Sequence, residues 1–196
     1  MKTKIAALLI AAALAGCANI AKVEGDQVVN QRLAVRLADA WNKVSPPGGA
    51  EPYETWTQEG LSLDQLRFWA GIKPGQALMK PRPAAVADGK PPRVPTYASG
   101  MQADQLVDLF QTVYSADGSI VTVTKVEPAA FAGARGVRFE FTVTRKRDDL
   151  ELGGVGWASV SKGDLFAATF VAPRLSFYRR LLPRAESVVR TAQVRS

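Results

Sequence analysis

The chain has 196 residues, with 25 Lys and Arg against 18 Asp and Glu, a formal net charge of +7, one cysteine and no histidine. This length suits a single domain with a sizeable core. Because imidazole is absent, Ser-His-Asp and Cys-His catalysis and the commonest zinc sites are excluded. Carboxylate-pair and Ser/Lys chemistry remain open, but no spacing of residues indicates either. We therefore expect no catalytic residue, metal site or cofactor.

A secretory signal pattern opens the chain. Lys2 and Lys4 precede an apolar run at residues 5–13 that is too short to span a membrane. The next four residues, Leu14-Ala15-Gly16-Cys17, resemble the lipobox of bacterial lipoproteins. The resemblance implies that residues 1–16 are removed and that Cys17 carries acyl chains. Ordinary signal-peptide cleavage after Ala13-Leu14-Ala15 is the alternative.

The same resemblance implies a location. In a bacterium with two membranes, Ala18 in place of an aspartate implies the outer membrane, with the protein facing the periplasm. Residues 17–26 are then a lipidated tether, and residues 27–196 form one domain. The acyl chains make the membrane a partner. A nucleic-acid partner is not expected for an exported protein.

The first half of the domain shows strand patterns. Apolar and polar residues alternate through residues 27–37, which predicts one half-buried strand. Residues 53–72 contain two apolar runs on either side of Glu59-Gly60 and predict a hairpin.

A proline-rich insertion follows at residues 73–100. It holds half of the twelve prolines, so we expect no regular element there. Two interpretations stay open, an arm that contacts a partner and an insertion without a role. The prolines are Pro74, Pro81, Pro83, Pro91, Pro92 and Pro95.

The second half begins with an amphipathic pattern at residues 101–114, which predicts a helix that ends at Ala116-Asp117-Gly118. Four strand patterns follow and predict an antiparallel meander. The predicted strands are residues 119–127, 136–147, 152–161 and 164–172.

Three local features of this half have a functional and a structural interpretation. Asp148-Asp149 with Glu151 could bind a metal or catalyse, but their place between strands favours a hairpin turn. The glycines at 153, 154 and 156 favour a bulge or strand bend over a phosphate-binding loop. The four tryptophans favour core positions over a sugar-binding platform. They are Trp41, Trp56, Trp69 and Trp157.

The chain closes with a helical pattern at residues 173–194. Leu175, Tyr178, Leu181 and Leu182 share one face, and Pro183 predicts that a second short helix starts there. The segment is basic, and its arginines are candidates for contact with lipid headgroups or an acidic partner, a solvated helix face being the alternative. The candidates are Arg174, Arg179, Arg180 and Arg184.

The order of helix, meander and closing helix, with Leu-Phe-Ala-Ala-Thr-Phe-Val-Ala-Pro at residues 165–173, resembles the PsbP/Mog fold. This resemblance covers residues 27–196 as a pattern of elements. It implies an α+β domain with an antiparallel sheet flanked by helices, an α/β/α sandwich. Proteins of this fold act by binding, and no functional residue is carried over from them.

These observations lead to three hypotheses about function. The first is a non-enzymatic, lipid-anchored envelope protein that binds or helps to assemble another envelope component at the outer membrane. The second is a carrier that shelters an apolar ligand between sheet and helix. The third is an envelope hydrolase that uses carboxylates.

Overall fold

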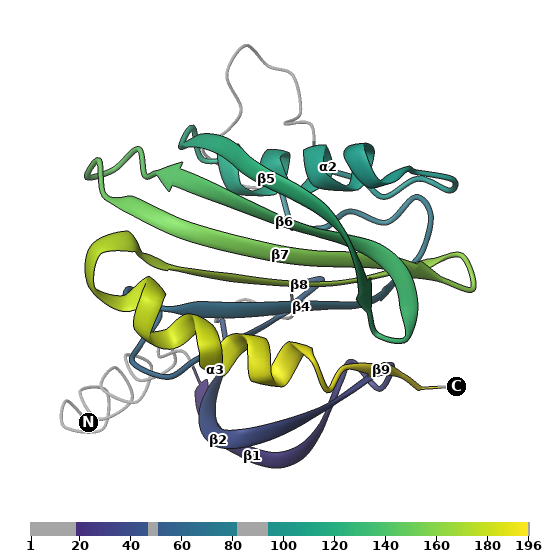
Figure 1. Cartoon of the computed structure of the whole chain (residues 1–196), viewed down its shortest axis with the longest axis horizontal. Coiled ribbons are helices and arrows are strands. Elements are labelled where there is room, and N and C mark those ends of the chain that lie inside the picture. Colours follow the sequence, from purple (N-terminus) through teal and green to yellow (C-terminus); the bar gives the residue numbers. More distant parts are fainter. Residues whose placement is uncertain (1–18, 47–50, 82–93, 196) are drawn as a thin grey trace, which may run out of the picture.

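One antiparallel sheet organises the chain in the computed structural model, which describes residues 19–46, 51–81 and 94–195. The strands lie in the order β1-β2-β3-β4-β8-β7-β6-β5, and β9 pairs with β2 (Figure 1). The strands are β1 (Asn19–Val29), β2 (Leu33–Ser45), β3 (Glu54–Thr57), β4 (Gln65–Ile72), β5 (Ile120–Phe131), β6 (Ala134–Thr144), β7 (Glu151–Ser161), β8 (Asp164–Pro173) and β9 (Gln193–Val194). The helical elements of the described residues are α2 (Ala103–Ser115), a π-helical turn η2 (Arg174–Tyr178) and α3 (Arg179–Val189).

The central strands carry apolar side chains on both faces of the sheet. In β8, Phe166 and Phe170 belong to a core that includes α3, whereas Leu165 and Val171 belong to a second core that includes α2. Side chains alternate between the two faces of a strand, so the two helices cover opposite faces (Figure 1). A single domain with an antiparallel sheet and two helices is thus confirmed. The sandwich is only partial, because α2 contacts β5 and β6 while α3 contacts β2 and β8.

The first predicted strand, residues 27–37, is wrong in its extent, because a hairpin turn lies inside it. Val29 ends β1 and pairs with Leu33 at the start of β2, while Asn30 and Gln31 take positive φ angles of 44° and 58°. Directly paired residues of antiparallel strands point to the same face. Positions 29 and 33 have the same parity, so the alternation continues unbroken through the turn and conceals it. Residues 19–26, expected in the tether, also belong to β1.

Most later elements match their patterns. The predicted hairpin at residues 53–72 is formed by β3 and β4, and the predicted helix at 101–114 is α2. The four predicted strands are β5 to β8, which pair in sequence as an antiparallel meander. The Asp148-Asp149 pair lies in the β6–β7 turn, as predicted, where Asp149 has a φ of 53°.

The glycines of β7 form no bulge, which corrects that part of the sequence interpretation. Strand β7 pairs with β6 and β8 without a register shift. A Cβ at Gly154 would lie 2.4 Å from the ring of Phe141, and one at Gly156 would lie 2.2 Å from Phe139. These glycines leave room for the aromatic rings of the α2-side core.

The C-terminal helix also differs from its prediction. Pro183 lies inside α3, and no second helix starts at it. Pro183 has no N–H group to donate to the carbonyl of Arg179, four residues earlier. Arg179 lies at the junction of η2 and α3, where the hydrogen-bond pattern of the helix already changes, so the helix can continue through the proline. The π-helical turn also breaks the 3.6-residue period, so Leu175, predicted on the packed face, is 98% exposed.

The described flanks of the proline-rich insertion, residues 73–81 and 94–100, contain one isolated bridge, between Ala77 and Thr96, and no helix or strand. They nevertheless pack on the domain. Leu78 and Tyr97 are buried, and the indole of Trp69 donates a 2.8 Å hydrogen bond to the carbonyl of Leu78. Residues 82–93 lie outside the described residues.

Candidate functional site

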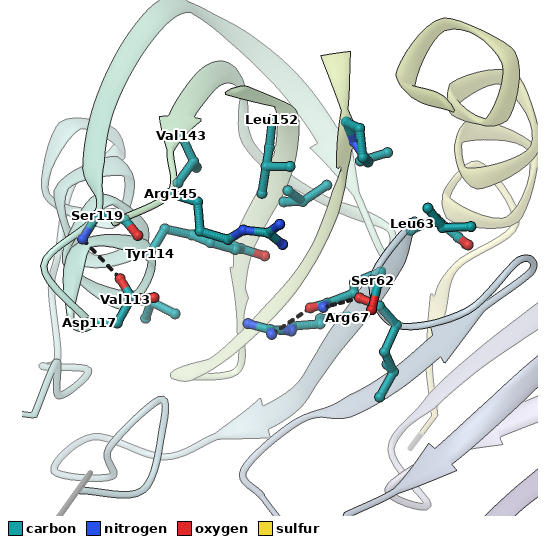
Figure 2. A pocket seen from close by; sticks show the side chains of 16 residues that line it. Ser62, Leu63, Arg67, Val113, Tyr114, Asp117, Ser119, Val143, Arg145 and Leu152 are labelled. Atoms are coloured by element: carbon teal, nitrogen blue, oxygen red, sulfur yellow. Dashed lines mark hydrogen bonds between the residues drawn. The ribbon is translucent and has the colours of Figure 1, made fainter. Parts of the chain in front are cut away.

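A pocket of about 130 Å³ lies at one end of the sheet, where β4 and β7 begin and β6, β8 and α2 end. Figure 2 shows side chains from these elements around it, with Arg67, Tyr114 and Arg145 extending toward the same space. Leu63 and Leu152 belong to its apolar wall. The pocket therefore combines charged and polar side chains with apolar ones.

Arg67 supplies a positive charge that has no carboxylate partner among the described residues. Its guanidinium carbon lies 4.9 Å from the ring centre of Tyr53 and 5.6 Å from that of Tyr114. Nη2 donates a 2.6 Å hydrogen bond to Oε1 of Gln65, while the buried Nε has no partner in the described part of the chain. These cation–π contacts with the two rings stabilise the charge of Arg67.

Tyr114 forms the wall beside Arg67. Its hydroxyl lies 2.6 Å from Oγ1 of Thr169, which is fully buried in β8. Burial raises the pKa of Tyr114, and the charge of Arg67 offsets part of that effect. The phenol is therefore neutral at physiological pH and serves as a fixed aromatic surface.

Arg145 differs from Arg67 because its charge is already compensated. Its Nε and Nη2 donate hydrogen bonds of 2.7 and 2.5 Å to the two carboxylate oxygens of Asp148. This arginine in turn lowers the pKa of Asp148. Of the two arginines that line the pocket, Arg67 is therefore the one without a carboxylate partner in the described part of the chain.

The rim of the pocket is the loop of residues 58–64, which is organised by a buried carboxylate. Asp64, 1% exposed, accepts hydrogen bonds from the hydroxyl of Thr57 and the backbone N–H groups of Gln58 and Glu59, at 2.7 to 2.8 Å. Gly60 has a φ of 117°, a conformation that other residues rarely adopt. The loop places Leu61 and Leu63 at the pocket.

The predicted contact arginines lie near this rim but do not line the pocket. Arg180 forms an ion pair with Glu59, and Arg184 donates a 2.6 Å hydrogen bond to Gln58, so α3 holds the rim loop. Arg174 pairs with Glu151 at the start of β7. Arg179 is exposed and has no hydrogen-bond or ion-pair partner among the described residues.

Other predicted features fall outside this site. The predicted lipidation residue, Cys17, lies outside the described residues. The four tryptophans are between 0% and 6% exposed, which confirms their core positions. Within the described ranges, no three Asp, Glu, Cys or His side chains are grouped to hold a metal ion. No helix of the described residues is long and apolar enough to span a membrane.

Arg67, Tyr53 and Tyr114 were not predicted as site residues. Arg67 occupies an ordinary alternating position between Leu66 and Phe68, and Tyr114 occupies the apolar face of a helix. The available signal was one arginine within an apolar strand. Only the pairing of β4 with β8 and the packing of α2 bring it to the tyrosine.

Neither a family model nor a curated protein sequence matches the chain. Among solved structures, the solution structure of cyanobacterial PsbP (CyanoP) from Synechocystis sp. PCC 6803 is similar, with a TM-score of 0.55 and 10% sequence identity. The match covers 92% of this chain and 95% of that one. At this identity the similarity concerns the fold alone. The chain therefore has a PsbP-like fold, and its described residues form a nine-stranded antiparallel sheet and two α-helices in one domain.

Proposed function

We propose that this chain is a non-enzymatic envelope protein, anchored by acyl chains on Cys17 at the outer membrane and facing the periplasm. Its activity is to bind another envelope component at the end of the sheet where the Arg67 pocket opens. The lipobox supports the anchor, and the pocket supports the binding role.

The uncompensated charge of Arg67 is the observation that carries this proposal. Removing a cation from water is costly unless a partner compensates for the lost hydration. Two tyrosine rings and Gln65 compensate in part, and the buried Nε lacks a partner in the described structure. Polar and apolar side chains line the pocket in similar numbers, and convergent polar groups beside apolar side chains are typical of ligand-binding sites.

Exposed leucines beside the pocket give further support. Leu61 is 41% exposed, Leu150 36% and Leu175 98%. They come from the rim loop, the β6–β7 turn and η2, all at this end of the sheet. Exposed apolar side chains near a pocket are typical of surfaces that bind a partner.

The two alternatives have less support from the geometry. A carrier needs space between sheet and helix, but the gap between α2 and the sheet that Phe110, Phe139 and Phe141 line does not admit a water molecule. A hydrolase needs a free carboxylate, but three hydrogen bonds engage Asp64 in holding the rim loop, and Asp117 accepts one from the backbone N–H of Ser119. Binding is the role that the pocket favours.

Photo-crosslinking in cells tests the binding role. Probes at Leu61 and Leu175 flank the pocket, and a probe at Val28, which is 42% exposed in β1, is the matched control. We expect the same protein to be crosslinked repeatedly at Leu61 and Leu175 and not at Val28. The same adducts from all three positions, or none near the pocket, would reject the proposal.

Mass spectrometry of the mature protein tests the anchor. Lipidation predicts an acylated N-terminus at Cys17, which Cys17→Ser abolishes together with membrane association. Ordinary cleavage after Ala15 would instead leave an unmodified chain that begins at Gly16.

A further inference from the structure

We infer that the Arg67 pocket binds a single carboxylate carried on a short apolar group, such as the last residue of a polypeptide or a short fatty acid. This inference rests on the proposed binding role of the same pocket and names the chemistry of its ligand.

The charge of the site favours a carboxylate. The planar guanidinium of Arg67 matches a carboxylate in geometry, and its contacts with Tyr53, Tyr114 and Gln65 hold it at the pocket before a ligand arrives. The carboxylates of Asp64 and Asp117 also line the pocket. They repel negative charge on a ligand, and because this repulsion is about twice as large for a phosphate dianion as for a carboxylate, the singly charged ligand is favoured.

The apolar side chains of the lining favour an apolar group on the ligand. Leu63, Val113, Val143, Leu152 and Val171 line the pocket and come from the rim loop, α2, β6, β7 and β8. Burying a methylene on such a wall stabilises a complex by about 0.8 kcal/mol. A polar ligand would leave this surface without a matching partner.

The size of the pocket limits the ligand further. A cavity of about 150 Å³ is enough to hold a benzene ring, so the pocket of about 130 Å³ holds a group of nearly that size. That space accommodates a carboxylate with a few carbon atoms, but not a sugar ring with its substituents or a nucleotide. The ligand is therefore one end of a larger molecule or a small acid.

Calorimetric titration of the full acylated protein in phosphatidylcholine nanodiscs tests the inference. The probes are the pentapeptide Gly-Ser-Gly-Ser-Leu as a free acid, the same peptide as a C-terminal amide, and butyrate. We expect the amide to bind at least about tenfold more weakly than the acid, because it lacks the charge that pairs with Arg67. Binding by the peptide acid identifies a chain terminus as the source, and binding by butyrate alone identifies a small acid.

Variants of the protein provide the controls. Arg67→Gln removes the charge and should weaken acid binding by at least about tenfold, whereas Arg67→Lys keeps the charge but loses the planar fork and should recover part of it. Arg179→Gln removes an exposed cation outside the pocket and should bind as the unmodified protein does. Since the comparison of acid with amide uses the unmodified protein, it does not depend on the folding of any variant.

Three results would overturn the inference: equal affinity for acid and amide, unchanged binding by Arg67→Gln, or no binding by either the acid or butyrate. Its failure is distinguishable from failure of the proposed function. A recurrent adduct at Leu61 without carboxylate binding would reject the ligand and keep the partner. Carboxylate binding without such an adduct would keep the ligand and reject the protein partner.

Discussion

The hydroxyl of Tyr114 lies 2.6 Å from Oγ1 of Thr169, and this hydrogen bond joins the last turn of α2 to the middle of β8. The same tyrosine presents its ring to Arg67. The packing of α2 on the sheet therefore also fixes one wall of the candidate site.

Replacing Tyr114 with Phe should destabilise the domain by about 1–3 kcal/mol, because the buried hydroxyl of Thr169 loses its partner. Urea unfolding measures the free energy. Adding Thr169→Val removes the orphaned hydroxyl, so the double variant should lose less than the sum of the two single losses. Strictly additive losses would show that this hydrogen bond contributes nothing.

Asp64→Asn should loosen the rim loop. One carboxylate oxygen that accepts a backbone N–H becomes an NH₂ group, and the loss of that hydrogen bond in a buried position costs about 1–3 kcal/mol. Hydrogen exchange of the loop amides and urea unfolding both report the change. Ser62→Ala, an exposed change in the same loop, is the control and should stay within about 0.5 kcal/mol of the unmodified protein. Equal protection in the two variants would contradict the role of Asp64.

Gly154→Ala should destabilise the α2-side core by about 1–3 kcal/mol, because the new methyl group would lie 2.4 Å from atoms of the Phe141 ring. Thermal unfolding detects the loss. The double variant Gly154→Ala with Phe141→Leu removes the clash. Its loss of stability should therefore be smaller than the sum of the losses in the two single variants. An unchanged melting temperature for Gly154→Ala would show that the ring moves aside without cost.

Tyr178 should make stability fall at alkaline pH. Burial, followed by the charge of Glu140, raises the pKa of Tyr178 to about 12. Because the pKa is raised in the folded state, the neutral phenol contributes fully to the free energy of unfolding below about pH 10, the ordinary pKa of tyrosine. This contribution is lost as the pH rises through 12. Between about pH 10 and 12, the free energy of unfolding of Tyr178→Phe should therefore rise relative to that of the unmodified protein by at most about 1.4 kcal/mol per pH unit.

Urea unfolding at pH 8 to 12 measures this difference between the two proteins. The ring of Tyr178 stacks on Phe170, with centroids 6.0 Å apart, and a phenylalanine at this position keeps that contact. The difference at pH 8 therefore serves as the internal reference. A constant difference over the whole range would show that Tyr178 does not ionise in a buried environment.

Local periodicity was sufficient to predict α2 and the meander. In α2 the buried residues Leu106, Val107, Phe110 and Val113 follow the helical spacing, and Gly118, at a φ of 87°, follows the helix end. In β6 the buried residues Val137, Phe139, Phe141 and Val143 alternate strictly. These elements bury one face each, so the sequence pattern and the structure agree.

Periodicity failed where neighbouring structure changes what a pattern means. The turn at Asn30-Gln31 preserves parity, so one alternating run contains two strands. The π-helical turn η2 changes which residues of the C-terminal helical segment face the sheet. The glycines of β7 are small because the rings of Phe139 and Phe141 on β6 occupy the space beside them. In each case the deciding contact is with a segment that the local pattern does not include.

The sequence by itself determined the period of α2 and of the meander strands, the turn at Asp148-Asp149 and the absence of imidazole chemistry, because these depend on the residues themselves or on near neighbours. Only the tertiary structure decided the candidate site. Arg67 in β4 and Tyr114 in α2 are 47 positions apart in the printed sequence, and Tyr53 comes from the segment before β3. Their contact requires the pairing of β4 with β8 and the packing of α2 on the same face, which no local pattern encodes.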